Sequence, residues 1–314
     1  MKSTVVGSFP VEQKSPSNVK DKLLSALGAY DSFKQSIEDC VTSQLDAGVD
    51  IVSDGQVRDD MVSIFTKYIP GMKIEDGNTV IVSKIKKPIQ EISIDDLKYA
   101  KKVMKDYYGG KIPEGKGIKG IITGPNTIVH SSRIQSFYKN KEDAIIDLAH
   151  SLKFEVDAIA KKVEPVYIQV DEPFLSTGMV DMKTAKEAID ILHEGLEVPL
   201  AMHVCGILDN AFKDISRFNV EILDMEFAGN NVNLGVLEKN ASLLAGKKVG
   251  FGCIDSSVNE VDDIEDVENL VKSAIDIVGA ENLLLDPDCG LRRAPKDVAF
   301  KKLQMMNQIK DKYS

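Results

Sequence analysis

Four side chains that commonly bind metal ions stand at or beside the ends of predicted strands. His203 and Cys205 are two residues apart in the segment AMHVCG, and this spacing on a strand points both side chains to one face. Glu226 ends the next predicted strand, and Cys289 follows the last one in DPDCGL. Imidazole, carboxylate and thiolate groups are all ligands that Zn²⁺ accepts in tetrahedral geometry. The His-x-Cys pair alone is more often structural, but the four residues together predict a zinc site.

Two adjacent carboxylates, Asp171 and Glu172, end another predicted strand in IQVDEP. Successive strand residues face opposite sides, so only one of the two can point into a site at the strand end. We expect Asp171 to be this catalytic-site carboxylate and Glu172 to bond to a neighbouring loop. Of the other cysteines, Cys40 shares a helical face with apolar residues and is expected in the core. Cys253 is expected to be a buried apolar residue, with a spare metal ligand as the alternative.

Short apolar runs alternate with amphipathic helical patterns along the chain, which favours a parallel α/β fold. The runs are Thr4–Phe9, Asp50–Asp54, Ile118–Thr123, Val166–Asp171, Leu200–Cys205, Val220–Glu226, Lys248–Ile254 and Asn282–Pro287. Eight strand–helix repeats predict a single (β/α)8 TIM barrel, with a doubly wound open sheet as the alternative. The candidate residues would then meet at the carboxyl ends of the strands, where such barrels place their active sites.

One segment does not follow the alternation. Between about residues 68 and 108, the stretch TVIVSKIKKPI predicts an extra strand or hairpin inserted after strand two. We find no internal repeat or linker, and we therefore expect one catalytic barrel domain over residues 1–314.

The formal net charge of −10 and the pI of about 5.1 argue against a nucleic-acid partner, which would select a basic stripe. No apolar run is long enough to span a bilayer, so no membrane association is expected. The sequence also begins without a signal-peptide pattern, and a cytoplasmic location is therefore predicted.

Seven motifs occur in an order that resembles the catalytic C-terminal domain of cobalamin-independent methionine synthase. They are VVGSFP, SDGQVRDDMV, GPNTI, IQVDEP, HVCG, DMEFAG and DPDCGL. The resemblance implies a zinc-binding barrel whose metal ligands are His203, Cys205, Glu226 and Cys289.

The same resemblance implies where homocysteine binds. Its contacts would be Val6, Gly7 and Ser8, with Ser8 at the substrate carboxylate, and Asp171 at the substrate ammonium. Gln56 stands near the place of a family glutamate that helps to hold the amine.

The chain differs from the family in residues that interact with folate there. It contains no tryptophan, and Ser131 stands near the place of the folate-stacking tryptophan. The segment CIDSSVN lacks the family's proton-donating histidine, and nothing corresponds to the N-terminal barrel that helps to bind folate. From these losses we expect the methyl donor to be a methylated corrinoid, either methylcobalamin or a corrinoid protein, with homocysteine as acceptor and methionine as product.

Three alternatives stay open. The donor could be methyltetrahydrofolate, or the chain could be a uroporphyrinogen-decarboxylase-like zinc methyltransferase that acts on another thiol. The third alternative is a scaffold protein with a purely structural zinc site.

Overall fold

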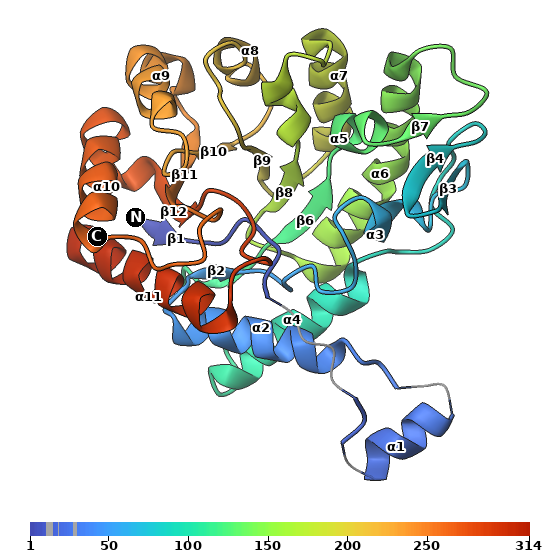
Figure 1. Cartoon of the computed structure of the whole chain (residues 1–314), viewed down its shortest axis with the longest axis horizontal. Helices are drawn as coiled ribbons and strands as arrows, with labels where there is room; N and C mark the ends of the chain where they lie inside the picture. Colours follow the sequence, from blue (N-terminus) through green and yellow to red (C-terminus); the bar gives the residue numbers. More distant parts are fainter. Residues whose placement is uncertain (11–14, 18, 28–29) are drawn as a thin grey trace.

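A curled sheet of parallel strands lies at the centre of the fold, with helices packed around its outside (Figure 1). The computed structural model describes residues 1–10, 15–17, 19–27 and 30–314. In these residues the largest sheet has seven strands, in the order β1-β12-β11-β10-β9-β8-β6. Its strands are β1 (Lys2–Ser3), β6 (Gly120–Thr123), β8 (Ile168–Asp171), β9 (Leu200–Val204), β10 (Ile222–Glu226), β11 (Lys248–Ile254) and β12 (Leu283–Pro287).

A second pairing extends this sheet toward closure. β5 (Gly117–Ile118) and β6 belong to one segment, interrupted at Lys119, and β5 pairs in parallel with β2 (Ile51–Val52). The Thr4 hydroxyl donates to the Ile51 carbonyl oxygen at 2.8 Å, which links the first strand segment to β2. Seven of the eight predicted strand regions contain a strand, and the first strand lies just before its predicted region. The predicted TIM-barrel-like α/β fold is confirmed.

The first strand differs from its predicted bounds. It covers Lys2–Ser3, whereas the apolar run is Thr4–Phe9. Beyond Thr4 the backbone oxygens bond to side chains instead of a ladder: Val6 accepts from Gln169 and Gly7 accepts from Ser53, both at 2.8 Å. The run is apolar because it is buried, although its backbone groups are satisfied outside the sheet.

Helices follow most of the strands. Their bounds are α1 (Val19–Ala26), α2 (Lys34–Asp46), α3 (Ser63–Thr66), α4 (Ile94–Tyr107), α5 (Pro125–His130), α6 (Lys141–Val163), α7 (Met182–His193), α8 (Phe212–Ile215), α9 (Val232–Asn240), α10 (Ile264–Val278) and α11 (Lys296–Tyr313), with 3₁₀ turns η1 (Pro173–Thr177), η2 (Ala241–Leu244) and η3 (Ala280–Asn282). Among the described residues, no helix is both long enough and apolar enough to cross a membrane.

The predicted insertion after strand two is a hairpin. β3 (Met72–Glu75) pairs antiparallel with β4 (Asn78–Ile81), and β7 (Arg133–Ile134) adds to β4 in parallel. Asp76 and Gly77 form the turn with φ angles of +48° and +76°, the left-handed conformation that tight hairpins require.

That residues 1–314 form one domain stays a prediction.

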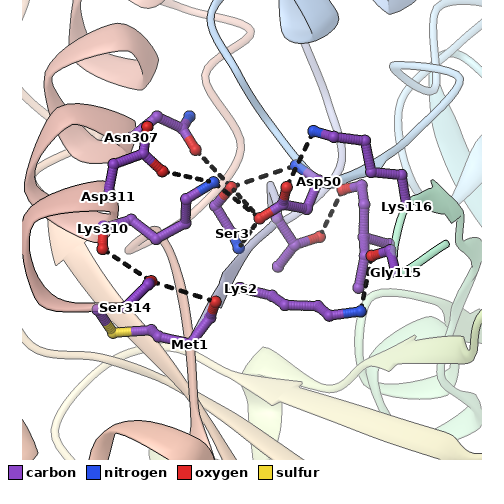
Figure 2. Close-up of polar contacts among 12 residues, drawn as sticks. Met1, Lys2, Ser3, Asp50, Gly115, Lys116, Asn307, Lys310, Asp311 and Ser314 are labelled. Atoms are coloured by element: carbon purple, nitrogen blue, oxygen red, sulfur yellow. Dashed lines mark hydrogen bonds and ion pairs between the residues drawn. The ribbon is translucent and has the colours of Figure 1, made fainter. Parts of the chain in front are cut away.

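A polar cluster joins the first strands to the last helix at the amino-terminal ends of β2 and β5 (Figure 2). Asp50, which precedes β2, accepts from the amines of Lys116 and Lys310 at 2.9 Å each and from the Ser3 backbone N–H at 3.0 Å. The cluster lies at the opposite ends of the strands from the candidate site.

Candidate metal centre

The strand register places two carboxylates beside the predicted ligand His203. His203 lies in β9 and is paired with Asp171 of β8 on one side and with Asp224 of β10 on the other. All three side chains are buried. Cys205 follows directly after β9, two residues beyond His203, and so leaves the strand on the same face.

Three of the four predicted metal ligands come together. Donor atoms of His203, Cys205 and Cys289 all lie within 4.8 Å of one another, and no other such group of three or more occurs in the described ranges. Both ring nitrogens of His203 are buried without a hydrogen-bond partner among the described residues. A bound cation would satisfy such a nitrogen, and a donor set of one imidazole and two thiolates suits Zn²⁺. The residues present therefore fit a zinc ion.

The two cysteines of this group differ in charge. The interaction with Cys205 has the largest effect on Cys289 and, together with the neighbouring His203 ring, lowers the pKa of Cys289 to about 4, against the opposing effect of burial. The same Cys205–Cys289 interaction and burial raise the pKa of Cys205. The lowered pKa of Cys289 favours its thiolate, which is the form that binds a cation.

Glu226, the fourth predicted ligand, lies outside the 4.8 Å group. Its Oε2 accepts from the Gly206 backbone N–H at 2.7 Å, and its Oε1 accepts from the Asn230 amide. The carboxylate is thereby held next to the residue that follows Cys205. Its coordination of a metal stays a prediction. Without it, the imidazole and the two thiolates leave one position open, as in catalytic zinc sites.

Sequence reasoning missed Asp288, which fixes the loop after β10. Its carboxylate accepts three consecutive backbone N–H groups at 2.5–3.0 Å, those of Phe227, Ala228 and Gly229. Burial raises the pKa of Asp288 to about 7, although these hydrogen bonds oppose the shift. Asp288 thus ties the loop after Glu226 to the residue before Cys289. The available signal was the second aspartate of DPDCGL.

Gln169 joins the two predicted substrate-binding segments and was also missed. Its amide nitrogen donates to the Val6 carbonyl oxygen at 2.8 Å and to Asp171 Oδ1 at 2.7 Å, and its Oε1 accepts from Lys119 at 2.5 Å. Gln169 lies two residues before Asp171 in β8 and therefore shares its face. That alternation was the signal by which the sequence could have identified it.

The other predicted substrate contacts lie against each other or against the metal group. A Cβ on Gly7 would lie 3.0 Å from Gln56 Oε1, so the Gln56 amide packs on the Gly7 backbone. Gln56 Nε2 is buried and has no partner in the described part of the chain. A Cβ on Gly290 would lie 2.0 Å from Ser8 Oγ, so Ser8 packs on the residue that follows Cys289. The barrel therefore brings these segments to the side of the three ligands.

Asp171 and Glu172 turn to opposite sides of β8, as the alternation predicts. Burial is the largest effect on Asp171 and raises its pKa to about 6, while the charge of His203 and the Gln169 hydrogen bond oppose it. Glu172 instead accepts four hydrogen bonds at 2.7–3.0 Å from Asn126 and Thr127 in α5. Asp171 is thus the carboxylate beside the ligands, and Glu172 bonds to the helix α5, where a loop was expected.

Three further charged side chains are buried inside the barrel and were not identified from the sequence. They are Lys119, Asp224 and Asp286, each at most 2% exposed. Burial and the neighbouring Asp224 charge raise the pKa of Asp286 well above its ordinary value. Cys253, in contrast, is buried in the apolar core cluster and is not part of the ligand group.

Fold and geometry together define a class of protein, an α/β barrel with a thiolate-rich candidate metal centre at the carboxyl ends of its strands. The family described as "Cobalamin-independent synthase, Catalytic domain" matches residues 1–312, and the chain belongs to this family. The predicted family resemblance is therefore confirmed, and so is the prediction of a methyltransferase.

Two similar relatives are methionine synthases of methanogenic archaea. The protein from Methanothermobacter thermautotrophicus is 47% identical over 308 residues, which cover 98% of each chain. The one from Methanocaldococcus jannaschii is 44% identical over 317 residues, 98% of this chain and 97% of the relative. Both relatives thus match this chain over nearly their whole lengths.

Solved structures confirm the fold. The B12-independent methionine synthase from Shewanella sp. W3-18-1, in complex with selenomethionine, superposes with a TM-score of 0.78 at 22% identity and covers 98% of this chain and 96% of that one. The putative vitamin-B12 independent methionine synthase from Listeria monocytogenes gives 0.71 at 18% identity and covers 99% and 98%.

The expected methyl donor is wrong. We expected methylcobalamin or a corrinoid protein, but the family to which the chain belongs is cobalamin-independent. The error was to infer a different methyl donor from the family residues that this chain lacks. The absence of tryptophan and of a histidine in CIDSSVN removes two particular contacts, but it does not identify the molecule that binds in their place.

Proposed function

We propose that this chain is a zinc-dependent methionine synthase that moves a methyl group from methyltetrahydrofolate to the thiol of homocysteine. The observation that carries the proposal is the grouping of the donor atoms of His203, Cys205 and Cys289 within 4.8 Å at the carboxyl ends of the strands. Zinc bound there would lower the pKa of the substrate thiol and keep it as the nucleophilic thiolate.

Residues from two strands and one loop of the chain would hold the metal. The His203 imidazole and the thiolates of Cys205 and Cys289 would bind it from the strand end and from the loop after β12. Glu226 lies on the neighbouring strand, and its two hydrogen bonds keep its carboxylate beside the Cys205 loop. We propose that Glu226 would be the fourth residue to hold the metal.

The amino-acid end of homocysteine would bind across the metal group, between Asp171 and the segment Val6–Ser8. Asp171 offers a buried carboxylate to the substrate ammonium, and Ser8 offers its hydroxyl to the substrate carboxylate. The buried Gln56 Nε2 supplies a further donor that has no partner in the described structure. Because Gln169 bonds to both Val6 and Asp171, it fixes the spacing of the two ends of this pocket.

An aromatic pair is the group that we propose to pack against the flat pterin ring of the donor. The His130 and Phe174 rings stack with centroids 5.5 Å apart and an interplanar angle of 30°. They belong to α5 and η1, which follow β6 and β8 at the carboxyl end of the sheet. His130 is the neighbour of Ser131, so the pair stands close to the place where the family carries its tryptophan.

The cytoplasmic location remains a prediction.

The test is methionine formation from homocysteine and methyltetrahydrofolate by zinc-loaded protein. Cys289→Ser should abolish the activity, because it removes a ligand. Cys253→Ala should keep it, because Cys253 is a buried cysteine outside the ligand group. Methyl transfer from methylcobalamin but not from methyltetrahydrofolate, whether mono- or polyglutamylated, would contradict the proposed donor. Full activity of the Cys289→Ser variant would contradict the proposed metal site.

A further inference from the structure

A carboxylate with no established role lies against the imidazole of His203. Asp224 Oδ1 is 3.3 Å from His203 Nδ1, and the two side chains are 4% and 2% exposed. The residues are register partners on β10 and β9, so their backbones hold the side chains next to each other. A charged group buried this deeply is expensive unless it has a partner, and His203 is the partner that the geometry supplies.

Asp224 faces three other buried ionisable groups, His203, Lys119 and Asp286, and its Oδ1 lies against His203. Apart from the His203 contact, Oδ1 has no hydrogen-bond partner among the described residues. On the other neighbouring strand stands Gly250, where a Cβ would lie only 2.6 Å from the Asp224 Cβ. Any side chain at position 250 would therefore collide with Asp224. The fold keeps a space for this carboxylate on one side and orients it toward His203 on the other.

The carboxylate on the other side of His203 is already engaged. Asp171 Oδ1 accepts from the Gln169 amide at 2.7 Å, and the same amide nitrogen donates to the Val6 carbonyl oxygen in the predicted substrate segment. The two carboxylates that flank the imidazole thus differ in their partners. Asp171 is tied to the substrate pocket, and Asp224 is tied to the ring.

We propose that Asp224 is a positioning residue of the metal centre, which accepts the Nδ1–H of His203 and thereby commits Nε2 to the metal. The inference rests on the proposed function only in taking His203 as a ligand. A carboxylate that accepts the second ring N–H of a ligating histidine fixes its tautomer and orientation and makes it a stronger donor. Greater electron donation from the imidazole would help to keep a metal-bound thiolate nucleophilic.

The first measurement is zinc affinity, determined by chelator competition in the absence of substrate and donor. Asp224→Ala should weaken zinc binding about 10- to 100-fold, as losses of such outer contacts typically do. Asp224→Asn should weaken it less, because the amide oxygen can still accept from Nδ1–H. Asp50→Asn is the matched control, since it removes a partly buried carboxylate at the opposite end of the barrel and should leave the affinity unchanged.

The second measurement reads the histidine tautomer directly. The chain has only 4 histidines, so ¹⁵N-labelled histidine gives a simple long-range ¹H–¹⁵N spectrum. In the zinc-loaded protein, His203 should carry its proton on Nδ1, and Asp224→Ala should abolish the protection of that proton from exchange. The tautomer, read from the ¹⁵N chemical shifts of the folded protein, would not respond to a general loss of stability, and Asp50→Asn controls for the effect of stability on exchange.

His203→Ala separates this inference from the proposed function. If His203→Ala loses zinc while Asp224→Ala binds it as tightly as the unaltered protein, the inference fails and the metal site stands. If His203→Ala also binds zinc at full affinity, both the metal site and the inference are wrong. A proton on Nε2 of His203 in the zinc-loaded protein would overturn the inference whatever the affinities.

Discussion

At the scale of single residues, the site depends on which of two adjacent carboxylates points inward. Asp171 lies beside His203 with a pKa of about 6, so it is mostly ionised at neutral pH and can pair with an ammonium group. Glu172 faces the opposite side of the strand end and accepts hydrogen bonds from α5. Asp171 and Glu172 are adjacent, but their side chains point to opposite sides, so one has a substrate-binding role and the other a structural role.

We expect Asp171→Asn to raise the KM for homocysteine about 10- to 100-fold at pH 7.5. The reason is that a hydrogen bond to a charged group contributes about 1.5–3 kcal/mol. Steady-state kinetics with varied homocysteine would measure this change.

The zinc content of the Asp171→Asn protein serves as the control. It should match that of the unaltered protein, because Asp171 is not a ligand in the proposed site. An unchanged KM combined with lost zinc would assign Asp171 to the metal instead of the substrate.

At the scale of secondary-structure elements, Glu172 anchors the start of α5 from the end of β8. It accepts four hydrogen bonds from Asn126 and Thr127, both in the first turn of that helix. Gly124, just before α5, leaves the necessary room, because a Cβ there would lie 2.2 Å from the Glu172 carboxyl carbon. The helix that carries His130 is therefore placed by a residue of another strand.

Glu172→Ala should lower the free energy of unfolding by about 3 kcal/mol, since it leaves buried donors without acceptors. Glu172→Gln should lose less, because its amide oxygen still accepts. Urea denaturation of the two variants would measure the difference. Equal stability of Glu172→Ala and the unaltered protein would show that α5 does not depend on this anchor.

The sequence predicted the secondary-structure elements better than it predicted the contacts between their side chains. Seven of the eight apolar runs contain a strand of the barrel, since buried parallel strands read as short apolar segments. The same patterns could not reveal Lys119, Asp224 or Asp286, because a charge inside an apolar run gives no sign of the partner that makes its burial tolerable. Asp288 was missed for a similar reason, since its three hydrogen bonds go to the backbone of another loop.

At the scale of the whole molecule, the barrel assembles one site from distant parts of the chain. The predicted substrate segment begins at Val6, and the last predicted ligand is Cys289. The cluster around Asp50 stabilises this arrangement from the other end, because it joins β1, the start of β2 and α11 (Figure 2). Burial alone would raise the pKa of Asp50, but hydrogen bonds from Lys310 and Lys116 hold it below its ordinary value.

Asp50→Asn should lower the free energy of unfolding by about 3 kcal/mol at pH 7, because it leaves two partly buried lysines without their counter-charge. A carboxylate with a lowered native pKa stabilises the fold above its unfolded pKa of about 4, and this contribution is lost as the pH falls further. The difference between Asp50→Asn and the unaltered protein should therefore shrink below pH 4. Denaturation curves over this pH range would measure it, and a difference that grows toward low pH would contradict the assignment.

The most direct test of the central claim is zinc X-ray absorption, recorded with and without homocysteine. The account predicts two sulfur ligands and nitrogen or oxygen ligands in the free protein, and a third sulfur when homocysteine is added. Cys289→Ser should remove one sulfur from both spectra. A zinc shell that stays the same on addition of homocysteine would contradict the claim that this metal centre binds the substrate thiol.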